Sequence, residues 1–156
     1  MKKFLVLIGI IASLAIVGCS SLQLQPADFS WAAEEIVEVG AKGMVDAKRY
    51  SVAFSVTALL AQEFAADSMG AKNIKEVRLI RDRAGFYYLT GKKFKNVYVL
   101  AQSDAALAVS NTLIISPEKT MDDPKFDQKD TYIELWNGKE KYQLTKGGAQ
   151  PLGGKK

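Results

Sequence analysis

Large apolar side chains occupy every second position over several stretches of this chain. The clearest stretch is Arg49–Thr57, where tyrosine, valine and phenylalanine alternate with small or polar residues. A period of two predicts a strand with one buried face. Strands are also predicted at Lys75–Asp82, Phe86–Thr90, Phe94–Gln102 and Ala105–Ser116. Because only a few residues separate these four strands, we expect them to be antiparallel neighbours.

The C-terminal part contains the strongest turn signal. Asn137-Gly138 separates the alternating segments 132–136 and 141–145, which predicts a β-hairpin. The 15 residues from Ser116 to Asp130 contain two prolines and are expected to form a long loop. Residues 147–156 contain four glycines and a proline, so a disordered tail is expected there.

The pattern changes at residues 58–67, where leucine, phenylalanine and several alanines favour a short helix. Thr57 is its expected N-cap. Upstream, the turn cluster Gly40–Gly43 predicts a hairpin over residues 29–45. A helix from Ser30 to Val39 is the alternative for the first part of this segment.

These elements amount to about seven or eight strands in sequential antiparallel order, with one short helix. Such a set favours a mainly β fold, either an antiparallel sandwich or a small barrel. An α+β domain, with the helix packed on one face of a sheet, is the alternative. Residues 29–146 are expected to form this single globular domain, because a segment of that length suits one hydrophobic core.

The first 21 residues have the composition of a targeting segment. Lys2 and Lys3 precede an apolar run from Phe4 to Gly18, which is 15 residues long. A positive start, an apolar centre and small residues at the end are the order of a secretory signal. The run is shorter than the roughly 18 to 20 residues of a spanning helix, which makes a permanent span the weaker interpretation.

Ile16-Val17-Gly18-Cys19 resembles the lipobox of bacterial lipoproteins. The resemblance implies that residues 1–18 are removed as a signal peptide and that Cys19 becomes the acylated first residue. Residues 19–28 would then be a lipidated tether, and two or three acyl chains would hold the protein firmly on a membrane. By the same resemblance, Ser20 implies the outer membrane in a host that has one, on its periplasmic or its surface side.

Composition limits the chemistry that the domain can perform. The chain has one cysteine and no histidine. It therefore cannot form an internal disulfide, and it lacks the residues for Ser-His-Asp or Cys-His catalysis and for histidine-ligated zinc. Removal of residues 1–18 leaves 19 basic and 17 acidic residues. The mature chain is nearly neutral, so no nucleic-acid partner is expected.

Three groups of residues could carry other chemistry, and each has a plainer interpretation that we expect to hold, with no metal and no cofactor. Ser116 and Lys119 have the S-x-x-K spacing of a Ser-Lys nucleophile, but they also suit a proline turn after a strand. Four loop acids could hold calcium if interleaved lysines did not neutralise them; they are Asp122, Asp123, Asp127 and Asp130. Three solvated glutamates could instead supply a carboxylate pair for glycoside cleavage; they are Glu34, Glu35 and Glu38.

A run of cations among aromatic residues is a further candidate surface. Basic and aromatic groups together favour anionic ligands such as lipid headgroups. The cations are Arg78, Arg81, Arg83, Lys92, Lys93 and Lys95. Alternation along the strands must nevertheless send some of the aromatic side chains into the core.

The sequence therefore favours a lipid-anchored cell-envelope protein without catalytic activity, which acts as an interaction or structural module for an envelope protein partner. A carrier of a small apolar or amphiphilic ligand is the first alternative, because a barrel of this strand count can enclose one. An envelope hydrolase is the second alternative. It would need a cleft in which Ser116 or a glutamate pair converges with other polar groups.

Overall fold

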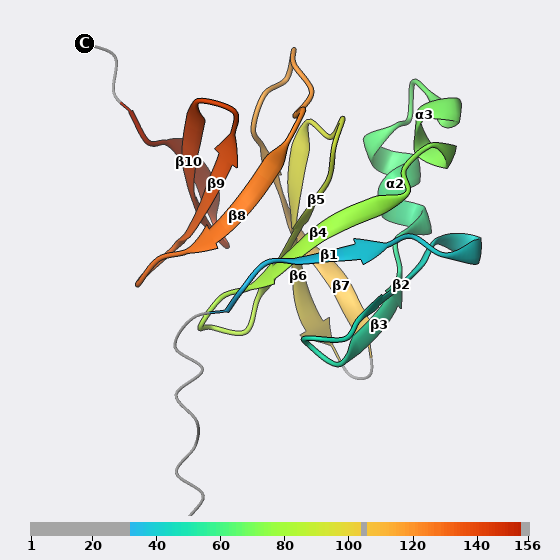
Figure 1. Cartoon of the computed structure of the whole chain (residues 1–156), viewed down its shortest axis with the longest axis horizontal. Helices are drawn as coiled ribbons and strands as arrows, with labels where there is room; N and C mark the ends of the chain where they lie inside the picture. Colours follow the sequence, from blue (N-terminus) through green and yellow to red (C-terminus); the bar gives the residue numbers. More distant parts are fainter. Residues whose placement is uncertain (1–31, 104–105, 154–156) are drawn as a thin grey trace, which may run out of the picture.

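The structure is a computed structural model, and it describes residues 32–103 and 106–153. Within these residues, eleven strands form three antiparallel sheets, accompanied by two short α-helices and a 3₁₀ turn (Figure 1). The predicted fold class, a mainly β antiparallel sandwich, is confirmed. More strands are present than predicted, and two of them form in segments that the sequence predicts to be a loop and a tail.

A five-stranded sheet forms the middle layer, in the order β1-β4-β5-β6-β7. Its strands are β1 (Glu35–Glu38), β4 (Glu76–Arg81), β5 (Tyr87–Thr90), β6 (Asn96–Ser103) and β7 (Ala106–Ile114). Neighbours pair in antiparallel register, so that Leu79 lies opposite Leu89 and Leu89 lies opposite Tyr98. The predicted sequential pairing of the four strands between residues 75 and 116 is confirmed.

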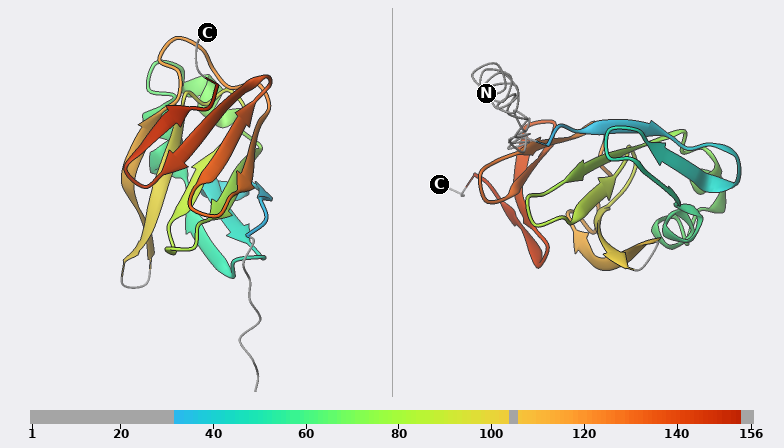
Figure 2. Two further views of the ribbon diagram at one scale, coloured as in Figure 1. Left: turned by 90° about the vertical axis from the view of Figure 1, so that its left-hand side faces the viewer. Right: turned by 90° about the horizontal axis from the view of Figure 1, so that it is seen from below.

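A four-stranded sheet covers one face of the middle layer, in the order β11-β10-β9-β8 (Figure 2). Its strands are β8 (Pro124–Gln128), β9 (Ile133–Asn137), β10 (Glu140–Thr145) and β11 (Gly148–Pro151). The predicted hairpin at Asn137-Gly138 is confirmed, since Asn137 pairs with Glu140. Gly138 has a φ of 61°, a conformation that glycine adopts at little cost.

The other face of the middle layer carries a small hairpin and the helices (Figure 1). The elements there are β2 (Met44–Ala47), β3 (Val52–Ser55), α2 (Thr57–Glu63) and α3 (Ser68–Lys72). The sequence predicts the helix at residues 58–67, and α2 is shorter and has Val56 rather than Thr57 as its N-cap. The hydroxyl of Thr57 instead donates to Lys42 O over 2.9 Å. In the described part of the chain, no helix has the length and apolar character to cross a membrane.

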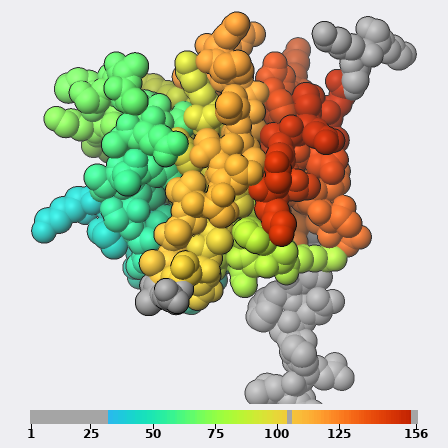
Figure 3. Space-filling model, turned by 180° about the vertical axis from the view of Figure 1, so that it is seen from behind, coloured from blue at the N-terminus to red at the C-terminus, as the bar shows by residue number. Residues whose placement is uncertain are grey.

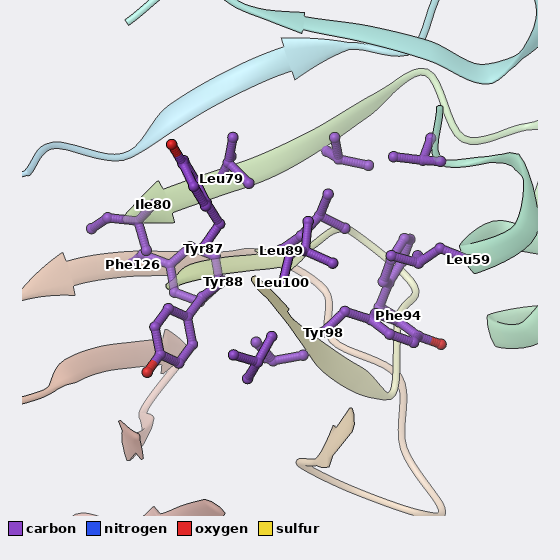
Figure 4. Close-up of a cluster of buried hydrophobic side chains, with 14 of the residues drawn as sticks. Leu59, Leu79, Ile80, Tyr87, Tyr88, Leu89, Phe94, Tyr98, Leu100 and Phe126 are labelled. Carbon is purple, nitrogen blue, oxygen red and sulfur yellow. The ribbon is translucent and has the colours of Figure 1, made fainter. Parts of the chain in front are cut away.

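Side chains from all three layers meet in one hydrophobic core. β5 is buried at every position, because both of its faces are covered. Tyr50 packs edge-on against Tyr87 with ring centroids 5.7 Å apart, and Tyr88 points to the other side, toward the four-stranded sheet (Figure 4). Burial of these side chains is the main favourable contribution to folding. The largest fully buried ones include Tyr88, Phe94, Tyr98, Leu79, Ile80, Leu89, Met121, Ile133, Leu135 and Leu144.

The predicted hairpin over residues 29–45 is wrong in its pairing. The turn at Gly40–Gly43 is present, and Gly40 N donates to Met44 O over 2.8 Å. However, β1 pairs with β4, and β2 pairs with β3. The turn takes the chain out of the five-stranded sheet, so strands that are consecutive in sequence belong to different sheets. The alternative helix, Ser30–Val39, is also wrong, because four of its residues form β1.

The predicted loop and tail need correction as well. Within the predicted loop Ser116–Asp130, β8 forms from a segment in which buried positions alternate with exposed charged ones. Within the predicted disordered tail, residues 147–156, β11 pairs with β10. The glycines of this segment allow a tight turn, and β10 supplies the hydrogen-bonding partner that a short strand needs. Residues 154–156 lie outside the described part of the chain.

Candidate functional site

The two larger sheets approach each other along two seams. At one seam β4 lies near β8, and at the other β7 lies near β11. We call these the β4–β8 seam and the β7–β11 seam. Among the described residues, no strand ladder joins the two sheets at either seam. Side chains and flanking segments therefore determine how firmly each seam is closed.

The residues before β1 close the β4–β8 seam. Glu34 accepts hydrogen bonds from Phe126 N of β8 and from Arg78 Nη1 of β4, each over 2.8 Å. Arg78 Nη2 also lies 3.2 Å from Asp123 Oδ1. The Arg78 and Glu34 side chains are 12% and 18% exposed. This shielded ion pair bridges both sheets, and removing one partner would leave a charge in a largely desolvated place.

The two preceding residues are held at the same end of the molecule. Ala32 N donates to Oε1 of the buried Gln128 over 2.6 Å. Ala33 O accepts from the Tyr50 hydroxyl over 2.6 Å, and that hydroxyl accepts from Arg81 N over 3.3 Å. Ala32 and Ala33 are therefore fixed at the end of the domain where β4 and β8 both end.

The β7–β11 seam has a much smaller connection, and β7 is open to solvent along most of its length (Figure 3). Asn111 Nδ2 donates to Lys146 O in the β10–β11 turn over 2.9 Å. The first half of β7, from Ala106 to Ser110, precedes this contact and is exposed at four of its five positions. Ser110 forms a β-bulge, and its hydroxyl donates to Val99 O of β6 over 3.1 Å.

The edge strands differ in how they are protected against pairing with another chain. Charged residues and prolines on edge strands discourage strand addition. β1 carries two glutamates, β8 carries a proline, a lysine and an aspartate, and β11 ends in a proline. β7 contains neither a charged residue nor a proline, although at nine residues it is the longest strand described. Among the outer strands of the two larger sheets, β7 is therefore the least protected edge.

The six basic residues predicted as an anionic-ligand surface do not lie together. Arg78 is already ion-paired at the β4–β8 seam. Antiparallel pairing of β4 with β5 separates the others, because β5 carries the chain from one end of the sheet to the opposite end. Arg81 and Arg83 lie at one end, and the residues at the other end are Lys92, Lys93 and Lys95. The aromatic residues among them are mostly buried, namely Tyr87, Tyr88, Phe94 and Tyr98.

A pocket of about 140 Å³ lies beside Gln128, the residue that Ala32 contacts. Asp82, one of its lining residues, accepts from the Tyr88 hydroxyl over 3.0 Å and from Phe86 N over 2.9 Å. Burial raises the pKa of Tyr88, and the nearby Asp82 carboxylate raises it further. The lining combines both signs of charge in the residues Asp82, Arg83, Gln128, Lys129, Asp130, Thr131 and Tyr132.

Glu63, which the sequence does not single out, organises a second polar cluster. Its carboxylate accepts from Lys95 N over 2.5 Å, from Asn96 Nδ2 over 2.8 Å and from the Tyr98 hydroxyl over 2.7 Å. Burial raises the pKa of Tyr98, and the hydrogen bond to Glu63 adds to this effect. These bonds tie the end of α2 to the start of β6, so the cluster has a structural role. A lone glutamate at a helix end offers no sequence signal for it.

The residues considered for catalysis or metal binding do not converge. Ser116 Oγ accepts from the backbone N of Lys119 over 3.1 Å, which is the geometry of a turn. Within residues 32–103 and 106–153, no group of three or more acidic residues could hold a metal ion. Large side chains of both sheets occupy the interior that a carrier would use for a ligand. The loop acids pair with different cations: Asp123 with Lys125, Asp127 with Lys129 and Asp130 with Arg83.

Cys19 and the sequence that resembles a lipobox lie outside the described residues. The chain matches no family model, no curated protein and no solved structure.

Proposed function

We propose that this chain is a lipoprotein of the cell envelope, anchored through lipid on Cys19, and that its domain binds an envelope protein without catalysis. The unprotected edge of β7 is the observation that carries the binding part of the proposal. The resemblance of Ile16–Cys19 to a lipobox supports the anchor. In a host with an outer membrane, that membrane is the proposed location.

The backbone of β7 offers the means of binding. β7 is the last strand of its sheet in the described chain, so its outward N–H and C=O groups belong to no ladder there. An extended segment of another protein can add to such an edge as a further strand, held by main-chain hydrogen bonds. The half from Ala106 to Ser110 is the accessible part, because the β10–β11 turn contacts the strand at Asn111.

An extended, uncharged segment of a different protein is the partner that fits this edge. β7 offers small and apolar side chains, among them Val109 at 47% exposure, and no charge that could pair with a charged partner. A charged side chain of the partner, placed opposite these β7 residues, would lose hydration without gaining an ion pair. A second copy fits less well. Antiparallel pairing of two β7 strands would point the two domains in opposite directions, whereas two copies anchored on one membrane would both have the same end toward it.

Photo-cross-linking in native membranes tests the β7 edge. A photoreactive amino acid replaces Ala108 in β7 and, as a matched control on the other edge of the same sheet, Ile36 in β1. We expect the Ala108 position to form an adduct with an uncharged segment of another envelope protein, identified by mass spectrometry of the cross-linked peptides. We expect the Ile36 position to give little adduct, and Val109→Lys to abolish the adduct at position 108.

Three outcomes would contradict the proposal. Equal adduct yields from both edges would show that β7 is not a specific binding edge. An adduct that persists with Val109→Lys would show that it does not depend on strand addition. Adducts between two β7 strands would replace the envelope protein with a second copy as the partner.

A further inference from the structure

We infer that the outer face of the four-stranded sheet binds a glycan built of uncharged sugars. The outer face is the side of β8–β11 that points away from the five-stranded sheet. The left view of Figure 2 shows it toward the viewer, with no other described element over it. This site is separate from the β7 edge and takes a different class of ligand, so it does not depend on the binding proposed for β7.

Alternation along the strands brings two rows of side chains onto the outer face. Leu135 of β9 is fully buried, so its neighbours Glu134 and Trp136 lie on the outward side of the strand. In the first row, the strand register places Lys125 and Lys141 on either side of Trp136. The second row crosses all four strands and carries only carboxylate and amide groups; it consists of Asp127, Glu134, Gln143 and Gln150.

Trp136 supplies the apolar surface on which a sugar ring can pack. It is the one aromatic residue among the exposed large hydrophobic residues of the described chain, and it is 37% exposed. Lys141 Nζ lies 3.5 Å from the centroid of its ring and 3.5 Å from Oε1 of the nearly covered Glu134, so the ring and the ammonium group hold each other in place. A pyranose ring with equatorial hydroxyls has a flat face of C–H groups, which packs against the exposed part of an indole.

The second row supplies partners for the hydroxyl groups at the rim of the sugar. The Asp127 side chain is 53% exposed, Gln150 is exposed and Gln143 is half-buried, so all three can be reached from solvent. Carboxylates accept hydrogen bonds from hydroxyls, and amides both donate and accept them. Neighbouring strands lie about 4.8 Å apart, so the row spans roughly 14 Å across the sheet. That is long enough for more than one sugar unit.

The charges of the outer face favour an uncharged ligand. Its lysines are matched by acids within the sheet or beside it: Lys141 with Glu134, Lys125 with Asp123 and Lys129 with Asp127. A charged ligand would have to compete with these pairs, whereas a hydroxyl can use the lone pairs that each carboxylate keeps. The core of a protein interface is depleted in charged residues. This face carries charges in both rows, and Trp136 is the one exposed large hydrophobic residue of β8–β11, so a folded protein fits it less well than a glycan.

Titration calorimetry on the full-length protein, in a detergent without sugar headgroups, tests the inference. The probes are cellotetraose and chitotetraose, which share flat pyranose rings with equatorial groups and differ in the acetamido group of the second. Binding of either one supports the inference, and a preference for chitotetraose would show that the acetamido group is recognised as well. We expect Trp136→Ala to weaken binding about tenfold and Gln143→Ala to weaken it several-fold. Glu140→Gln is the control, because Glu140 is exposed on the same strand but has the opposite parity to Gln143, and it should leave the affinity unchanged.

Tryptophan fluorescence locates the ligand without altering the site. The chain has two tryptophans, so Trp31→Phe leaves Trp136 as the single one, and its emission should shift on saturation with the sugar that binds. Three results would overturn the inference: neither tetrasaccharide binds, binding is as tight in Trp136→Ala, or the emission of Trp136 stays unchanged on saturation. A photoreactive amino acid in place of Gln143, used in native membranes, gives a fourth, because a protein adduct there would mean that a protein covers this face instead of a glycan.

Discussion

The two seams of the sandwich join the same pair of sheets but are closed in different ways. At the β4–β8 seam, Glu34 forms a shielded ion pair with Arg78 of one sheet. The same carboxylate accepts a hydrogen bond from the backbone N of Phe126 in the other sheet. At the β7–β11 seam, the connecting hydrogen bond runs from Asn111 to Lys146 O, near solvent. The residue directly before β1 thus closes one seam, while the strand beside the other seam has an uncharged edge that belongs to no further ladder in the described chain.

The two sides of the domain therefore differ in how firmly side chains hold the sheets together. Side-chain bonds that join the two sheets are concentrated at the β4–β8 seam. At the other seam, the first half of β7 stays exposed, as the proposed binding edge requires. The following changes test this difference, beginning with the one that should have the largest effect.

Loss of Glu34 should open the β4–β8 seam. In Glu34→Ala, the guanidinium of Arg78 loses its most shielded partner and Phe126 N loses its acceptor. We expect the free energy of unfolding to fall by about 2–4 kcal/mol, measured by urea denaturation. Glu38→Ala is the control, since Glu38 is exposed on the adjacent strand, and it should change stability by less than about 0.5 kcal/mol. If both substitutions lowered the free energy of unfolding equally, Glu34 would contribute no more to stability than an exposed glutamate does.

High pH should weaken the core that lies between the seams. Burial raises the folded-state pKa of Tyr88 and Tyr98 above their ordinary value of 10.0. Below pH 10 both tyrosines are protonated in the folded and unfolded states. Above it the unfolded chain ionises first, so each tyrosine lowers the free energy of unfolding by up to about 1.4 kcal/mol between pH 10 and pH 11.

Unfolding curves at pH 8, 10 and 11 measure this loss. The double variant Tyr88→Phe, Tyr98→Phe should be less stable at pH 8, because Asp82 and Glu63 each lose a hydrogen bond, but its stability should fall less steeply above pH 10. An unchanged slope in the double variant would assign the alkaline loss to other groups.

Removal of the Asn111 side chain should have a smaller effect than the loss of Glu34. Asn111→Ala deletes the hydrogen bond to Lys146 O at the β7–β11 seam. Because this bond lies near solvent, water can replace it, and we expect a cost of about 0.5–1 kcal/mol in the same urea experiment. A loss as large as that of Glu34→Ala would mean that the two seams are equally important for stability.

The smallest effect on stability is expected for a lysine on β7. Val109 is 47% exposed, so Val109→Lys should change the free energy of unfolding by less than about 0.5 kcal/mol. The same lysine should block strand addition at this edge. Two measurements separate these effects. The urea midpoints of Val109→Lys and of the unsubstituted protein should match, whereas the cross-link at position 108 should be lost. A large drop in stability would show that Val109 belongs to the core.

The sequence predicts the middle of the fold well for a physical reason. Between residues 75 and 116, alternation and short turns agree, and each strand pairs with the next. It fails where pairing is not local, as for β1, whose partner β4 lies about 40 residues away. It also fails where composition conceals a strand. In β8, the charged residues Lys125 and Asp127 alternate with the buried positions, so the segment resembles a polar loop. In β11, glycine and proline are typical of a turn or tail.

The candidate surfaces were less accessible to prediction than the fold. Glu34 and Arg78 are 44 positions apart, and nothing local in either segment indicates that they meet. The six cations look like one cluster in the sequence, yet β5 sends them to opposite ends of the sheet. The uncharged character of β7 is visible in the sequence. Its meaning appears only when the structure places β7 at an edge of the five-stranded sheet, opposite the charged edge strand β1.

The central claim is that Cys19 anchors this domain, and the mass of the mature protein tests it most directly. The protein is isolated from membranes of a host that processes lipoproteins, beside a Cys19→Ala variant. We expect a chain that begins at Cys19 and carries the added mass of its acyl groups, and we expect the variant to lose both that mass and membrane retention. A mature chain that begins elsewhere, without acyl mass, and that leaves the membrane with the soluble fraction would contradict the account.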